Sequence, residues 1–138
     1  MLDELIHNLL KEIDLEKEPV QLGPMSYQID FTKDLSITIK ANDPGYYMQI
    51  AIDRVTEYEA EALFITLMEA NVLGQGTGGG ILGLSLDDTV VMYSKKILKD
   101  LDYQEFKEKI EEFVNYSEFW RMEIKNHQEE KKKRPENA

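Results

Sequence analysis

Hydrophobic residues near the start of the chain recur at every third or fourth position. Polar residues, among them Asp3, Glu4 and Lys11, fill the positions between them. Such spacing puts one apolar stripe along a helix, so the sequence predicts an amphipathic first helix. The apolar positions are Leu2, Leu5, Ile6, Leu9, Leu10 and Ile13.

Beyond Pro19, Gly23 and Pro24, which end any helical pattern, apolar and polar residues alternate one by one. Period two is typical of half-buried strands. Three such stretches lie at residues 25–31, 35–40 and 46–52, and residues that favour turns separate them. We therefore expect an antiparallel meander with one apolar face.

A second helix is expected after Thr56, which has capping-box spacing to Glu59, and it should end at Gly74. Its apolar residues cover most of its circumference, so it needs more than one partner surface. Two further strands, at residues 81–86 and 89–94, follow around Asp87 and Asp88, and Asp102 begins a third helix. The order of helix, three strands, helix, two strands and helix predicts an α+β fold with helices packed on an antiparallel sheet.

The chain's 138 residues suit one domain, and a hydrophobic content of 42% can support its core. We expect residues 1–125 to form this domain and the charged residues 126–138 to be a flexible C-terminal tail. No stretch approaches the roughly 20 apolar residues of a membrane span, and Asp3 and Glu4 interrupt any signal-peptide core. The sequence thus predicts a soluble, cytoplasmic protein without membrane insertion.

Negative charge dominates the first two thirds of the chain. Residues 1–94 hold 5 Lys and Arg against 16 Asp and Glu, residues 95–138 hold 11 against 11, and the net charge is −11. Proteins bind nucleic acids chiefly by neutralising phosphates with Lys and Arg. We therefore do not expect nucleic acid as a partner.

Cofactor and catalytic motifs are weak in this sequence. The glycines of 74–79 satisfy G-x-G-x-x-G, but they leave a predicted helix and enter a predicted strand, the reverse of a dinucleotide loop. Cysteine is absent, and His7 and His127 stand near opposite ends of the chain, so no metal site or catalytic set can be drawn. We expect a structural glycine connection, no cofactor and no enzymatic activity.

Residues 67–92 read LMEANVLGQGTGGGILGLSLDDTVVM, and this stretch resembles the class I type III secretion chaperones, the Tir-chaperone group. Members share a helix ending in Asn-x-Leu, a Gly/Thr-rich crossing, a Leu-Gly-Leu strand, an acidic turn and a Val-rich strand. The charged segment after Trp120 departs from the compact end typical of the family. The matching positions are Asn71, Leu73, Gly74, Thr77, Gly78, Gly79, Leu82, Gly83 and Leu84.

The resemblance implies a cytoplasmic homodimer that binds the N-terminal chaperone-binding segment of a secreted effector. It would keep that segment extended and present it to the secretion apparatus, with the secretion ATPase as a further partner. The alternative is a non-secretory binding module of the same fold, similar to the YbjN-type proteins. A co-purified effector would separate the two.

Two groups of residues are the candidates for these interactions. The first helix and the meander carry more apolar side chains than their mutual contact needs, and the same holds for the second helix and the Leu-rich strand. The candidates for effector binding are Leu2, Leu5, Ile6, Leu9, Tyr27, Ile29, Phe31 and Ile37. Those for the dimer interface are Phe64, Leu67, Met68, Leu82 and Leu84.

Overall fold

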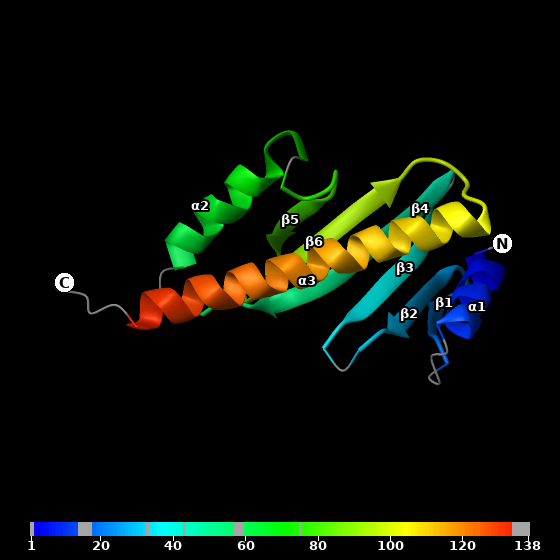
Figure 1. Cartoon of the computed structure of the whole chain (residues 1–138), viewed down its shortest axis with the longest axis horizontal. Helices are drawn as coiled ribbons and strands as arrows, with labels where there is room; N and C mark the ends of the chain where they lie inside the picture. Colours follow the sequence, from blue (N-terminus) through cyan, green and yellow to red (C-terminus); the bar gives the residue numbers. More distant parts are fainter. Residues whose placement is uncertain are drawn as a thin grey trace.

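The computed structural model describes residues 2–13, 18–32, 34–42, 44–56, 60–74 and 76–133. Within these residues it contains three α-helices, one short 3-10 helix and six strands (Figure 1). In chain order they are α1 (Leu2–Glu12), β1 (Val20–Gly23), β2 (Ser26–Asp30), β3 (Ser36–Asn42), β4 (Gly45–Arg54), α2 (Ala60–Asn71), η1 (Val72–Gly74), β5 (Ile81–Leu84), β6 (Val90–Ile97) and α3 (Tyr103–Lys133).

The strands form one sheet in the order β1-β2-β3-β4-β6-β5, in which every neighbouring pair is antiparallel. This confirms the predicted α+β class and the meander. Strand β1 was not expected, because its four residues lie between Pro19 and Pro24 and are too few to show an alternation. Proline is tolerated beside a strand at the sheet edge, and β1 occupies an edge.

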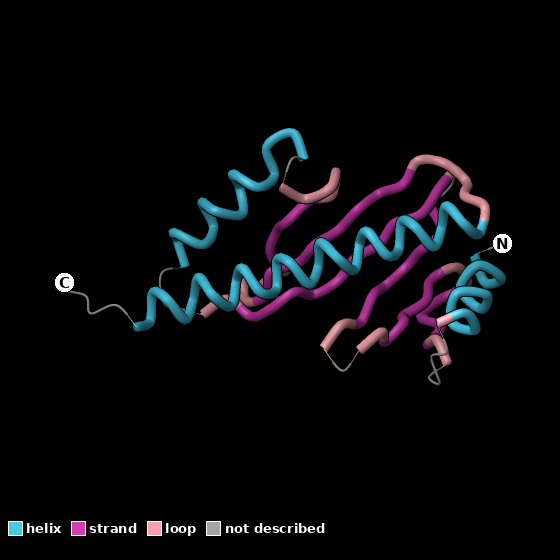
Figure 2. The backbone as a smooth tube through the Cα atoms, viewed as in Figure 1, coloured by secondary structure: helices cyan, strands magenta, loops and turns pink. Residues whose placement is uncertain are grey.

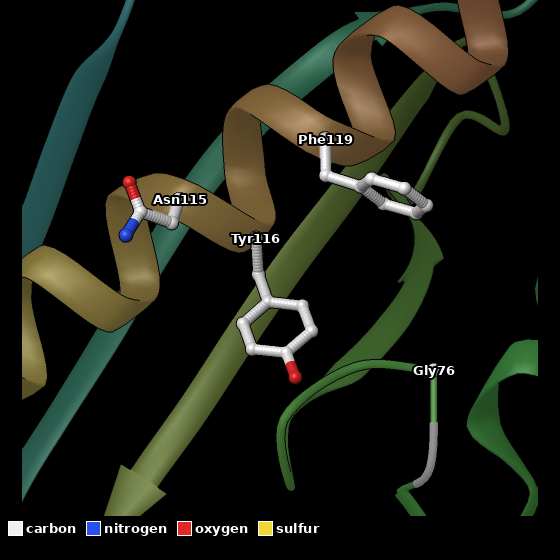
Figure 3. A pocket seen from close by; sticks show the side chains of 4 residues that line it. All are labelled: Gly76, Asn115, Tyr116 and Phe119. Carbon is white, nitrogen blue, oxygen red and sulfur yellow. The ribbon is translucent and has the colours of Figure 1, made fainter.

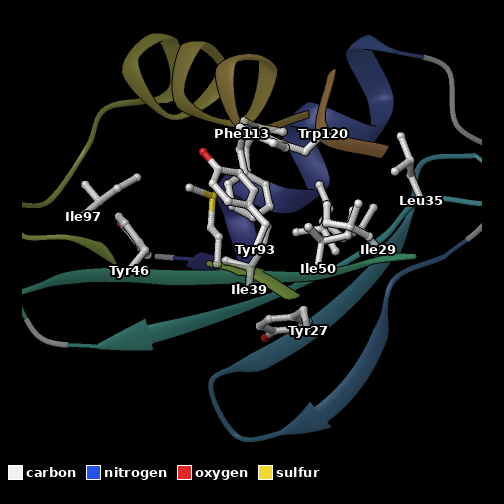
Figure 4. Packing of buried hydrophobic residues seen from close by; sticks show 14 of the residues in the cluster. Tyr27, Ile29, Leu35, Ile39, Tyr46, Ile50, Tyr93, Ile97, Phe113 and Trp120 are labelled. Atoms are coloured by element: carbon white, nitrogen blue, oxygen red, sulfur yellow. The ribbon is translucent and has the colours of Figure 1, made fainter. Parts of the chain in front are cut away.

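Helix α3 crosses one face of the sheet, α1 packs against α3, and α2 lies beside β5 (Figures 1 and 2). Side chains that alternate along the strands meet α3 in a single core (Figure 4). Tyr93 of β6 stacks on Phe113 of α3 with ring centroids 4.7 Å apart. Apart from the exposed Met25, the apolar period-two positions of the predicted meander therefore face the helices, and the intervening polar residues face away.

The start of α3 is the capping box expected at Asp102. The amide of Glu105 donates to Asp102 Oδ1 at 2.8 Å, and the amide of Asp102 donates to Glu105 Oε1 at 3.4 Å. Both amides lack an acceptor within the helix, and each thus donates to the side chain of the other residue.

Helix α3 also continues across the domain boundary expected at residue 126. Ile124 is buried, and Gln128 Oε1 accepts hydrogen bonds from the Thr56 amide at 2.8 Å and from Thr56 Oγ1 at 2.9 Å. The Gln128 side chain also donates to the Arg54 carbonyl at 3.3 Å. The expected tail therefore begins inside a helix that is tied to the end of β4, and residues 134–138 lie outside the described residues.

The predicted capping role of Thr56 concerns the start of α2. That helix begins at Ala60, and Glu59, the other half of the expected box, lies outside the described residues. Thr56 instead donates to Gln128 from the far end of the chain. A local spacing could not indicate this partner, because it comes from the tertiary structure.

The turn between β5 and β6 forms at Asp87 and Asp88, as the sequence predicts. Asp88 adopts a left-handed backbone with φ 59°, which explains how the turn works without a glycine. The carboxylate of Asp87 accepts from Thr89 Oγ1 and Ser85 Oγ, each at 2.7 Å. These bonds lower the pKa of Asp87 to about 2, because they favour the charged form.

Candidate interaction surfaces

Most of the residues predicted to bind an effector lie in the hydrophobic core. Leu5 and Phe31 are the exceptions, because they are half-buried and pack against the core from its margin. A helical or strand stripe predicts which face is apolar, but not whether another element covers it. Leu2, Ile6, Leu9, Tyr27, Ile29 and Ile37 are each at most 8% exposed.

An apolar hollow of about 380 Å³ lies beside Phe31, between the end of α1 and α3. Ile13, at its rim, is 38% exposed, and Glu111 adds a carboxylate. Clefts that hold small ligands have volumes of about 300 Å³ or more. A hollow of this volume can therefore hold one or two large side chains of a bound segment. Its lining residues are Leu9, Ile13, Phe31, Ile110, Glu111, Val114 and Asn115.

Ion pairs join α3 to α1 and to the turn between β2 and β3. Lys107 Nζ contacts Glu12 Oε1 at 2.7 Å, and Arg121 contacts Asp34 Oδ2 at 3.0 Å. The Lys107 hydrogen bond, followed by one from Tyr103, lowers the pKa of Glu12. Burial and the Glu12 carboxylate raise the pKa of Tyr103 to about 12, so its hydroxyl remains a donor at neutral pH. Both ion pairs lie at the surface, where such pairs contribute little to the free energy of unfolding. Their main effect is to orient α3 relative to α1 and to the turn after β2.

Helix α2 and the first residue of η1 present an uncovered apolar ridge. Ile65, Met68 and Val72 are 53%, 70% and 58% exposed, and their spacing places them on one side of the helix. Leu63 and Leu67 are buried on the opposite side. We call Ile65, Met68 and Val72 the α2 surface. Exposed apolar patches on a soluble domain commonly mark interaction sites.

The residues predicted for a dimer interface divide between this surface and the core. Leu67 and Leu82 are buried within the protomer, while Phe64 and Leu84 are half-buried. Met68 is the one that belongs to the α2 surface. Ile65 and Val72 were missed as interface candidates, although the all-round apolar pattern of the helix had signalled them.

A second exposed apolar group lies at the opposite sheet edge. Val20 and Leu22 of β1 are each 53% exposed, and Met25, in the turn that follows, is 48% exposed. We call these three residues the β1 surface. Because α2 packs on β5, the two surfaces lie at opposite edges of the sheet (Figure 1).

The glycine-rich segment connects α2 and η1 to β5, as predicted. Gly74, Gly78 and Gly79 have positive φ angles of 68°, 60° and 83°, which confirms the expected use of glycine. A Cβ at Gly78 would also lie 2.4 Å from the Tyr116 ring. Tyr116 and Phe119 point from α3 toward Gly76 (Figure 3), beside a cavity of about 310 Å³.

Hydrogen bonds from the sheet and α3 hold this segment through its carbonyl groups. Tyr93 donates to the Thr77 carbonyl at 2.5 Å, and Trp120 Nε1 donates to the Gly76 carbonyl at 2.8 Å. Lys95 Nζ donates to the Gly78 carbonyl at 2.7 Å and contacts Glu112 at 3.1 Å. Residues 76–78 are therefore held by the sheet and α3 and support α2 against the sheet.

The Trp120→Phe variant tests this support. It removes the donor to the Gly76 carbonyl, so we expect a loss of about 1–3 kcal/mol in the free energy of unfolding. Met122, which is 58% exposed on the same helix, offers the control, because Met122→Leu should change stability by less than about 0.5 kcal/mol. Urea unfolding followed by circular dichroism measures both, and equal stabilities would show that the hydrogen bond contributes nothing.

Side chains that could ligate a metal do not gather in the part of the chain that the structure describes. His7 Nδ1 lies 3.1 Å from Asp3 on the exposed side of α1. No group of three or more potential metal-ligating side chains forms in the described ranges. Likewise, none of the helices there is long and apolar enough to cross a membrane.

Several solved structures share this fold. A chain of the ExsC–ExsE complex matches with a TM-score of 0.71 and 15% identity, covering 88% of this chain and 91% of that one. A chain of the HopA1–SchA chaperone–effector complex matches with a TM-score of 0.63 and 10% identity, covering 87% and 92%. For the ExoU–SpcU complex of the Pseudomonas aeruginosa type III secretion system the values are 0.59, 9%, 86% and 93%.

Sequence comparison also finds relatives. The Chlamydia pneumoniae protein CPj0713/CpB0740 is 36% identical over 62 residues, which are 45% of this chain and 47% of that protein. The match thus spans about half the length of this curated relative. Residues 4–121 match the model of the Tir chaperone protein (CesT) family. Because this match covers most of the chain, the protein belongs to the Tir chaperone protein (CesT) family.

Proposed function

We propose that the protein is a cytoplasmic type III secretion chaperone that acts as a homodimer. It binds the N-terminal chaperone-binding segment of a secreted effector, keeps it extended and presents it to the secretion apparatus. Family membership supports this proposal, and it implies a protein that acts by binding, not by catalysis. Two of the structures with the same fold are a chaperone–effector complex and a complex from a type III secretion system.

The observation that carries the proposal is the separation of two exposed apolar surfaces. A chaperone that dimerises and also binds cargo needs two such surfaces that do not compete. The α2 surface and the β1 surface lie at opposite edges of the sheet. We assign the homodimer contact to the α2 surface, where the same patch can meet itself across a two-fold axis.

Effector binding is assigned to the β1 edge and the hollow beside Phe31. An edge strand has unpaired amide and carbonyl groups, so an extended segment can add to β1 by backbone hydrogen bonds. The hollow can then receive one or two anchoring side chains of that segment. A disordered segment loses entropy on binding, so affinity should depend on such anchors more than on total area.

Charge favours a basic or polar effector segment. The chain carries a net charge of −11, and Glu111 places a carboxylate in the wall of the hollow. A Lys or Arg next to the anchoring side chain would meet this carboxylate at the rim. Such complementarity raises the association rate and selects among partners.

The test uses Leu5→Asp and Phe31→Asp, the two half-buried members of the predicted effector site. Cargo is first identified by co-purification from the native host and mass spectrometry, and its N-terminal segment is then titrated by calorimetry. We expect at least a tenfold loss of affinity in each variant, because a carboxylate replaces either Phe31 in the wall of the hollow or Leu5 on the apolar stripe of α1 that continues through Leu9.

Leu86→Asp is the matched control, because Leu86 is fully exposed in the turn between β5 and β6. It should bind the segment like the wild type. If Leu5→Asp and Phe31→Asp fold normally and retain wild-type affinity, the effector binds elsewhere and the assignment is wrong.

A further inference from the structure

The side chain of Asn71 pairs with the outer edge of β5. Asn71 Nδ2 donates to the Leu82 carbonyl at 2.7 Å, and the Leu82 amide donates to Asn71 Oδ1 at 2.8 Å. An added antiparallel strand would make the same two bonds to Leu82. The amide therefore occupies the position of a strand neighbour at this residue.

The register of β5 shows that these are edge groups. The Ser85 amide donates to the Val90 carbonyl of β6 at 2.9 Å, and Leu82 lies opposite Tyr93. The backbone amide and carbonyl groups of successive residues in a strand point to opposite sides. Because those of Ser85 point toward β6, those of Leu82 and Leu84 point away from it. On a strand of four residues, Asn71 thus closes one of two outward-pointing positions.

Asn71 is held where it can make both bonds. It is the last residue of α2, and the turn that follows is fixed by the Gly76 amide, which donates to the Ala70 carbonyl at 3.1 Å. Trp120 holds the same turn from α3. The backbone that carries the Asn71 side chain is therefore held in place by hydrogen bonds on its C-terminal side.

The opposite edge has a different character. Val20 and Leu22 of β1 are each 53% exposed, and the strand's own Gln21 donates to the Gly23 carbonyl at 3.0 Å. Exposed apolar residues on an edge strand favour pairing with another chain, whereas short strands and nearby prolines limit it, and β1 has the apolar residues as well as Pro19 and Pro24 at its ends. The two edges of this sheet are thus unequal.

We propose that Asn71 closes the β5 edge against strand addition and so directs an extended partner segment to β1. The identity of that segment as an effector rests on the proposed function, but the closure of β5 does not. Asn71 is a positioning residue: it keeps the dimer side of the sheet free of added strands while the other side receives them.

The test replaces Asn71 with leucine and with aspartate in the full chain. Asn71→Leu removes both bonds and leaves an apolar edge, so at tens of micromolar it should sediment as species larger than the wild type. The Leu82 amide should exchange its hydrogen at least tenfold faster. Asn71→Asp should keep the wild-type mass, because it retains an acceptor and a charge blocks edge pairing.

The control is Asn126→Leu, the same substitution at an exposed position of α3, and it should behave like the wild type. If Asn71→Asp assembles as Asn71→Leu does, destabilisation and not edge opening is the cause, and the proposal is overturned. A wild-type Leu82 amide that exchanges as fast as an unstructured one overturns it even if Asn71→Leu does not fold. None of these measurements needs an effector, so their failure is distinct from failure of the proposed function.

Discussion

The Gly45→Ala variant should lose about 3 kcal/mol or more of its free energy of unfolding, the largest stability effect that we expect from a single methyl group. Gly45 begins β4 and lies against the end of β6. A Cβ at this position would lie 1.7 Å from the Ile97 carbonyl oxygen and 2.8 Å from the Lys99 amide nitrogen. Both are backbone atoms, so no side-chain rotation can relieve the overlap.

Gly83→Ala is the matched control for this substitution. Gly83 also lies in a strand, but a Cβ there would meet no atom within 4 Å. Its stability should stay within about 0.5 kcal/mol of the wild type. Thermal or urea unfolding of both variants measures the difference, and a Gly45→Ala protein as stable as Gly83→Ala would contradict the close packing of β4 on β6.

The second large effect is expected at Met68, in the α2 surface. At 70% exposure its side chain contributes little to the protomer, so Met68→Asp should fold normally. In the proposed homodimer two carboxylates would be buried where two apolar side chains were. We expect a cost of about 3 kcal/mol or more, which weakens dimerisation roughly a hundredfold.

Sedimentation equilibrium at micromolar concentration should show a dimer for the wild type and a monomer for Met68→Asp. Met25→Asp introduces the same change on the β1 surface, where Met25 is 48% exposed. This variant should remain a dimer and bind the effector segment more weakly. A wild-type protein that sediments as a monomer would contradict the dimer, and dimeric Met68→Asp would place its interface elsewhere.

The elements themselves could be predicted because they follow from local patterns. The stripe of α1 and the alternation of β2, β3 and β4 are properties of residue spacing, and the structure confirms them. The capping box at Asp102 and Glu105 is also local, because both partners lie within one helical turn. The positive φ at Gly78 is also a local property, because a residue without a Cβ adopts this conformation without strain.

Strand β1 and the cap at Thr56 could not be predicted in this way. A strand of four residues shows too little alternation, and β1 exists because β2 offers it a pairing edge. Thr56 has the spacing of a capping box, but its hydroxyl bonds to Gln128, 72 positions along the chain. Contacts between distant residues depend on how α3 lies on the sheet, which no local pattern encodes.

The candidate interaction surfaces likewise depend partly on local sequence patterns and partly on tertiary packing. Residue spacing indicated that α1 has an apolar stripe, that α2 is apolar over most of its circumference and that the glycine segment is a connection, and residues 67–92 showed the resemblance to a secretion chaperone. Tertiary structure decided which apolar side chains are accessible: it buries Leu2 and Ile6 under the fold and leaves Met68 in solvent. It also placed Asn71 on the β5 edge, whereas β1 forms the opposite edge of the sheet. The physical reason is that hydrophobicity belongs to a residue, whereas exposure depends on what the rest of the chain packs against it.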